Sequence, residues 1–120
     1  MSELQMGSGE KSFAELIWES EPISSGDLAK KSEQTLGWRK TTSYTVLKRL
    51  CDKGLFQNKN GTVSSLISRE DYHFKQGEQM VTGSFGGSLP AFLAAFTSRK
   101  KLTKQEIEEI QQMINDYKGE

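Results

Sequence analysis

The sequence has little of what most metal-binding or catalytic sites need, with one cysteine and one histidine among its 120 residues. Cys51 alone cannot form an intramolecular disulfide, and with His73 it cannot supply the ligands of a structural zinc site. We expect Cys51 to be a small core residue and His73 a surface or capping residue. The sequence therefore predicts a reduced, cytoplasmic protein without a metal or other cofactor.

Membrane and enzyme signals are also missing. No apolar run approaches the ~20 residues that a membrane helix requires, so direct membrane insertion is not expected. Residues 1–10 are polar and contain glycine, unlike a signal peptide, and are expected to form a disordered leader. The glycines between Gly83 and Gly87 lack the lysine and preceding strand of a phosphate loop. With no paired nucleophile and base, the sequence does not predict an enzyme.

Positive charge is not in excess overall, but it is unevenly distributed. The 16 Lys and Arg equal the 16 Asp and Glu, which argues against a protein that coats nucleic acid through bulk charge. Residues 27–60 nevertheless carry 8 Lys and Arg against 3 Asp and Glu, whereas residues 1–26 carry 1 against 5. Phosphate contacts require such a local basic surface, although a solvated lysine-rich surface gives the same excess.

The stretch from Trp38 to Phe56, WRKTTSYTVLKRLCDKGLF, predicts an amphipathic helix that ends at Gly54. At about 100° per residue, one face holds Ser43, Val46, Leu47 and Leu50. The opposite face holds Thr41, Thr45, Lys48, Arg49 and Asp52. One face can pack against a core while the other is free to read DNA, so we interpret the stretch as a recognition helix.

The flanking sequence predicts a winged helix-turn-helix domain over residues 11–68. One helix is expected from Ser12 and is ended by Pro22, and a second starts after Ser24 or Ser25, with Ile23 adding a short strand between them. Asn60-Gly61 is a strong hairpin signal, with strands at Phe56–Lys59 and Thr62–Ile67. The predicted fold class is therefore mainly α with a small β-hairpin.

Residues 69–120 are expected to form a helical dimerisation region. Capping boxes at Ser68 with Asp71 and at Thr103 with Glu106 open two of its helices. Its apolar residues follow helical spacing in two stripes: Leu89, Phe92, Leu93 and Phe96, then Ile107, Ile110, Ile114 and Tyr117. Two chains use a narrow seam of this kind to pair, and the alternative is that the seam folds back on its own domain.

Seven residues are the predicted DNA contacts, because base edges offer hydrogen-bond donors and acceptors whereas phosphates offer only charge. We assign four of them to the major groove: Thr41, Thr42, Thr45 and Lys48. We assign three to phosphates: Arg39, Lys40 and, on the hairpin, Lys59. A solvent-exposed helix that binds nothing can carry the same residues.

Three motifs make the chain resemble the penicillinase-repressor family of winged-helix regulators, which includes BlaI, MecI and CopY. They are IWE at Ile17–Glu19, W-x-x-x-T with L-x-R-L-x-x-K-G-L between Trp38 and Leu55, and FGGSLPAFLAAF followed by LTKQEIEEIQQMI. The resemblance spans residues 13–117. It implies a homodimer that binds a palindromic operator in double-stranded DNA and represses genes for β-lactam resistance or metal handling.

The resemblance also implies a mode of induction. In the β-lactam branch, a membrane-bound sensor metalloprotease triggers cleavage within the dimerisation region, and by position the candidate bond is Ala95-Phe96. Ala95 stands where that branch has asparagine, and the paired C-terminal cysteines of the copper branch are absent. The hairpin is several residues shorter than in the family and lacks its tyrosines, while Arg39-Lys40 replaces the family's Ser-Pro.

The sequence thus predicts a dimeric DNA-binding repressor without enzymatic activity. The alternative is a winged-helix protein-interaction adaptor that has lost DNA binding. Zero net charge and a short wing whose one cation is Lys59 favour this alternative.

Overall fold

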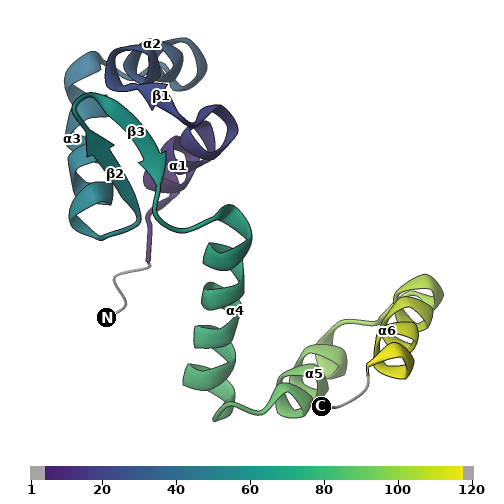
Figure 1. The fold of residues 1–120 in the computed structure, drawn as a ribbon. Coiled ribbons are helices and arrows are strands. Elements are labelled where there is room, and N and C mark those ends of the chain that lie inside the picture. The colour runs from purple at the N-terminus through teal and green to yellow at the C-terminus, as the bar shows by residue number, and fades with distance from the viewer. Residues whose placement is uncertain (1–4, 118–120) are drawn as a thin grey trace. The chain divides into compact units, whose positions relative to one another are not determined.

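The computed structural model describes residues 5–117, which form six helices and a three-stranded sheet (Figure 1). In chain order the elements are α1 (Ser8–Ser20), β1 (Ile23–Ser24), α2 (Ser25–Leu36), α3 (Lys40–Asp52), β2 (Phe56–Lys59), β3 (Thr62–Ser65), α4 (Arg69–Phe85), α5 (Leu89–Arg99) and α6 (Lys104–Asp116). Two compact units divide within α4, between Glu78 and Gln79.

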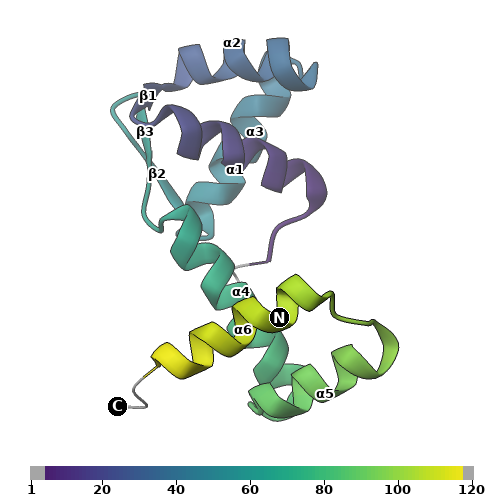
Figure 2. The same cartoon turned by 90° about the vertical axis from the view of Figure 1, so that its right-hand side faces the viewer.

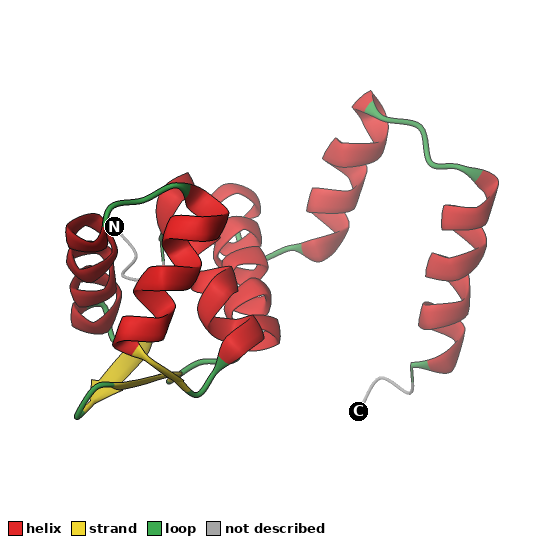
Figure 3. Cartoon of the chain, turned by 90° about the horizontal axis from the view of Figure 1, so that it is seen from above, coloured by secondary structure: helices red, strands yellow, loops and turns green. Residues whose placement is uncertain are grey.

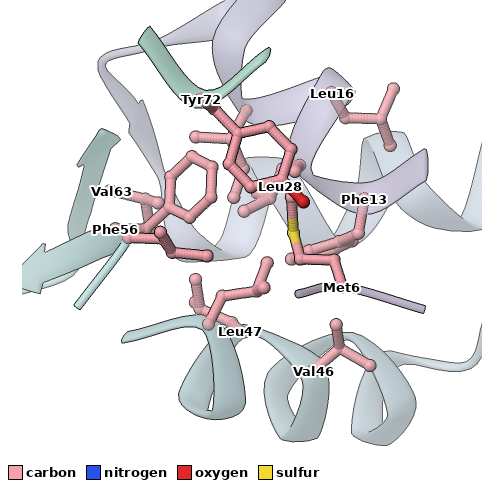
Figure 4. Packing of buried hydrophobic residues seen from close by; sticks show 13 residues of the cluster. Met6, Phe13, Leu16, Leu28, Val46, Leu47, Phe56, Val63 and Tyr72 are labelled. Carbon is pink, nitrogen blue, oxygen red and sulfur yellow. The ribbon is translucent and has the colours of Figure 1, made fainter. Parts of the chain in front are cut away.

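The first unit is a winged helix-turn-helix domain. Helices α1, α2 and α3 pack together, and the antiparallel sheet, with strand order β1-β3-β2, lies beside them (Figures 1 and 2). Ile23 pairs with Val63, so the short strand predicted at Ile23 is confirmed. One hydrophobic core contains side chains from the helices and the sheet. Its residues that are exposed by 1% or less include Phe13, Leu28, Leu50, Phe56, Val63 and Tyr72. Several of them converge in Figure 4, and this packing fixes the orientation of α3.

Helix α1 begins earlier than the sequence predicted. Its N-cap is Gly7 rather than Ser12, and the Glu10 carboxylate accepts a hydrogen bond from the Gly7 N–H at 3.0 Å. Met6 and Glu10, both from the predicted disordered leader, are 7% and 8% exposed. Residues 1–4 of that leader lie outside the described residues. The prediction failed for residues 5–10 because only contacts with distant parts of the chain bury these side chains.

The hairpin follows the predicted turn chemistry. Asn60 and Gly61 have φ of 54° and 88°, and a tight two-residue turn of this type needs positive φ at both positions. Strand β2 has the predicted bounds, whereas β3 ends at Ser65 rather than Ile67 (strands in yellow, Figure 3). The chain leaves the sheet there, and the carbonyl of Ile67 accepts a hydrogen bond from the Trp18 indole at 3.0 Å.

The first unit extends beyond residue 68, the expected end of the winged-helix domain. Tyr72, in the first turn of α4, is 1% exposed and belongs to the core of the first unit. Its burial explains why the first unit continues past residue 68, and the division falls after Glu78.

The second unit contains the end of α4 together with α5 and α6. Helix α4 continues through Gly83 and ends at Phe85. The next two residues, Gly86 and Gly87, both have positive φ. Thr103 and Glu106 form both bonds of the predicted capping box, at 3.0 and 2.9 Å. No single helix in residues 5–117 is long and apolar enough to cross a membrane, and α4 and α5 meet that criterion only as a bent pair.

Candidate nucleic-acid interface

Helix α3 presents two chemically different faces. Ser43, Val46, Leu47 and Leu50 are buried against the core. The predicted reading residues are all exposed: Arg39, Lys40, Thr41, Thr42, Thr45 and Lys48. The division of faces predicted from the helical angle is confirmed.

The outer face contains a shallow depression of about 180 Å³ lined by Thr41, Thr42, Thr45 and Arg49. Each threonine hydroxyl can donate or accept a hydrogen bond, and the guanidinium supplies several fixed donors. Base edges in the major groove offer the matching donors, acceptors and thymine methyl groups. Arg49 was predicted to lie on this face but was not among the predicted contacts, and the structure groups it with the threonines.

The start of α3 favours an anion. Its first turn contains no acidic residue, and Arg39 at the N-cap and Lys40 at the first helical position add two cations. The amide groups at a helix N-terminus carry partial positive charge, so these cations and the helix act together on a nearby phosphate.

Tyr44 also lies on the outer face, although it was not among the predicted contacts. It is 37% exposed, and the Lys40 ammonium lies 5.9 Å from the centroid of its ring. A helical angle of about 200° from Val46 could have revealed its position. Nearby, the Lys48 ammonium lies 3.3 Å from the Asp52 carboxylate, but both side chains are mostly exposed, so this ion pair adds little stability.

The N-terminal segment is hydrogen-bonded to the C-terminal end of α3. The Lys53 ammonium donates to the Glu10 carboxylate at 2.9 Å and to the Gln5 carbonyl at 2.8 Å. Arg49 lies 3.6 Å from the same carboxylate. Burial raises the pKa of Glu10, but hydrogen bonds from Lys53 and Gly7 and the charges of Lys53 and Arg49 outweigh it and hold the pKa below its ordinary value.

Trp38, which precedes the N-cap of α3, is held by aromatic packing. Trp38 stacks on Phe13 of α1, with 5.4 Å between ring centroids and an angle of 12° between ring planes. Sequence reasoning missed both anchors of α3 because each joins residues 25 or more positions apart.

The wing presents one of the predicted contacts. Lys59 is exposed at the end of β2, next to the turn at Asn60 and Gly61. The Asn58 side-chain carbonyl accepts a hydrogen bond from the Gly61 N–H at 3.0 Å, which stabilises the turn beside the lysine. Lys59 is the one cation between Phe56 and Ser65.

The second unit exposes five of the eight residues in the two predicted apolar stripes, and the other three, Phe92, Leu93 and Ile110, are partly buried. No residue of α5 or α6 is buried. The exposed fractions are high for large apolar side chains: Leu89 56%, Phe96 43%, Ile107 48%, Ile114 65% and Tyr117 73%. A groove of about 230 Å³ between the helices is lined by residues that include Phe92, Leu93, Phe96 and Ile110. Large apolar side chains exposed close together are typical of interaction surfaces.

Comparison with known proteins identifies the family. The sequence model described as penicillinase repressor matches residues 6–116. The chain belongs to the penicillinase repressor family. Penicillinase repressors are DNA-binding transcriptional regulators rather than enzymes, so membership does not favour the adaptor alternative.

Individual penicillinase repressors resemble the chain over nearly their whole length. The penicillinase repressor of Bacillus licheniformis is 26% identical over 119 residues, which cover 96% of this chain and 93% of the relative. The methicillin resistance regulatory protein MecI of Staphylococcus aureus (strain Mu50 / ATCC 700699) is 23% identical over 115 residues, covering 92% and 94%. MecI of Mammaliicoccus sciuri is 22% identical over 115 residues, with the same coverage.

The structure also locates other residues that the sequence analysis singled out. The Ala95-Phe96 bond lies inside α5, and both residues are exposed.

His73 is exposed, with its ring centroid 5.6 Å from that of Tyr72. Cys51 is partly buried, which raises the pKa of its thiol. No cluster of three or more His, Cys, Asp or Glu within residues 5–117 is suited to hold a metal ion.

Proposed function

We propose that the chain is a homodimeric repressor that binds a palindromic operator and controls β-lactam resistance or related stress genes. The observation that carries this proposal is the two-faced α3, which is buried on one side and exposes clustered hydroxyl and cationic groups on the other. Family membership supports the same function.

In the proposed complex, α3 lies in the major groove. Thr41, Thr42, Thr45 and Lys48 contact base edges, because they share the outer face and are not needed for the core. The phosphates on either side are bound by Arg39, Lys40 and, from the wing, Lys59.

Dimerisation is proposed to use the two apolar stripes of the second unit. Burying Leu89, Phe92, Leu93 and Phe96 of α5, and Ile107, Ile110, Ile114 and Tyr117 at α6, against a second copy removes this apolar surface from water. Two identical heads then meet two symmetric half-sites, which explains why the operator would be palindromic.

We further infer that induction by a membrane-bound sensor metalloprotease acts on the Ala95-Phe96 bond. Cleavage there would separate α6 and the end of α5 from the DNA-binding domain, and with them five of the eight apolar stripe residues. A fragment ending at residue 95, detected by mass spectrometry after the repressor is co-expressed with an activated sensor, is the expected result. Recovery of only the intact chain would contradict this route.

The DNA-binding proposal is tested by titrating promoter fragments at several salt concentrations in a mobility-shift assay. We expect the logarithm of the association constant to fall linearly with the logarithm of salt concentration, by about 0.9 per neutralised phosphate. Lys48→Ala should weaken specific binding about 5- to 150-fold, the range for loss of a base contact. Lys11→Ala, which removes an exposed lysine of α1, is the control.

Two outcomes would contradict the proposal. Affinity that is indifferent to salt and to Lys48→Ala would exclude the proposed use of α3. Failure to retard any promoter fragment would instead favour the adaptor.

A further inference from the structure

We propose that α2 and α3 together form a clamp for one DNA backbone phosphate, with the ammonium groups of Lys30 and Lys40 as its ligands. This inference rests on the proposed DNA binding and adds Lys30, from a different helix, to the contacts expected from α3.

The clamp is a pocket of about 160 Å³ lined by Gly26, Ala29, Lys30 and Glu33 of α2 and by Lys40 of α3. Two of the lining residues are small. Gly26 has no side chain, and Ala29, which is 5% exposed, has only a methyl group, so the pocket wall is partly formed by small residues. Small side chains allow an oxygen-rich group to approach the backbone closely, and both lysines are exposed residues.

Both lysines are available to a ligand. Among residues 5–117, neither ammonium lies within 4.0 Å of a carboxylate oxygen. This holds even though Glu33 lines the same pocket. Two lysines that line one small pocket beside the start of α3, neither with a carboxylate partner among the described residues, are suited to a phosphate carrying a single negative charge.

The clamp lies at the start of the helix that is proposed to enter the major groove. Lys40 is the first residue of α3, and its ammonium lies over Tyr44 on the outer face. A phosphate held between α2 and the start of α3 would therefore set the register of α3 along the DNA, which is the role of backbone contacts in sequence-specific complexes. Glu33 opposes the clamp by charge repulsion, so its removal should strengthen binding.

The first test compares the salt dependence of DNA binding among variants of the full chain. Lys30→Ala should reduce the slope of log K against log[salt] by about 0.9 for each half-site. Lys31→Ala is the matched control, because it removes the same charge from an adjacent exposed position of α2 that does not line the pocket. Glu33→Gln should raise affinity. Equal slopes for Lys30→Ala and Lys31→Ala would overturn the clamp.

The second test identifies the phosphate. DNA phosphates are replaced one at a time by neutral methylphosphonates, and binding of the wild-type chain and of Lys30→Ala is measured for each duplex. At one position per half-site, the replacement should weaken the wild-type chain but have little effect on Lys30→Ala, because the two changes remove the same contact. Each replacement neutralises a phosphate of the DNA itself, so its coupling to Lys30→Ala distinguishes a DNA phosphate from a free anion.

The outcomes separate the two proposals. If the wild-type chain binds promoter DNA but no replaced phosphate shows coupling to Lys30→Ala, the clamp is wrong and the proposed function stands. If the wild-type chain binds no DNA, the proposed function itself fails. Unchanged circular dichroism and thermal unfolding of Lys30→Ala would show that a loss of binding is not a loss of fold.

Discussion

Glu10 is the one buried acidic residue in the described part of the chain, and it joins α1 to the end of α3. Its carboxylate accepts hydrogen bonds from Lys53 and from the Gly7 N–H and lies near Arg49. These contacts stabilise the charged form of Glu10 although it is removed from water. A carboxyl group of this kind binds a proton less readily in the folded chain than in the unfolded chain. Glu10 therefore couples the anchoring of α3 to pH.

Glu10→Gln should lower the free energy of unfolding by roughly 1–3 kcal/mol at neutral pH, because Lys53 loses its charged partner. The folded-state pKa lies below the reference value of 4.5, so the stabilisation is fully present above that value. It is lost as the pH falls through the folded-state pKa. Denaturant unfolding between neutral and acidic pH should show the wild-type and variant stabilities converging.

The control for this measurement is Glu19→Gln, on the exposed surface of the same helix. Its effect should be small, since exposed charges contribute little to stability. A stability difference for Glu10→Gln that stayed constant across the pH range would show that its charge is not what anchors Lys53.

At the scale of elements, local signals predicted the hairpin turn and the caps of α2 and α6, but not the cap of α1, which is Gly7 rather than Ser12. The Asn60-Gly61 turn, the Ser24 cap of α2 and the Thr103 capping box all occur where their residue types indicated. These features depend on backbone angles and on hydrogen bonds within three or four residues, so neighbouring sequence suffices to predict them.

Two glycine substitutions should shift stability in opposite directions. Gly61→Ala should destabilise the wing by roughly 1–2 kcal/mol, because φ at this position is 88° and alanine is strained there. Gly77→Ala should stabilise α4 by about 0.5–1 kcal/mol, because Gly77 lies within the helix and an added Cβ meets no atom within 4 Å. Thermal unfolding measures both effects, and a stabilising Gly61→Ala would refute the assigned turn.

At the scale of the whole molecule, the chain combines a packed winged-helix unit with a unit whose helices bury no residue. Isolated helices of 11 and 13 residues are marginally stable in water unless an apolar face is covered. This is the physical reason why the second unit is proposed to fold against a second copy.

Ile110→Asp together with Ile114→Asp should convert the proposed dimer to a monomer, because two charges would be buried in the apolar seam without partners. Light scattering of the full chain measures the change. Gln105→Asp together with Gln112→Asp is the matched control, since it adds the same charges to the opposite side of α6. A double isoleucine variant that remained dimeric would place the interface elsewhere.

The sequence by itself determined the two faces of α3, the turn at Asn60-Gly61 and the N-caps of α2 and α6, because helical periodicity and backbone preferences act over a few residues. Only the tertiary structure decided the burial of Met6 and Glu10 and the pocket between Lys30 and Lys40. These features bring together residues that are distant along the chain or belong to different helices. No local pattern records such contacts, because they exist only once the core has oriented the elements that carry them.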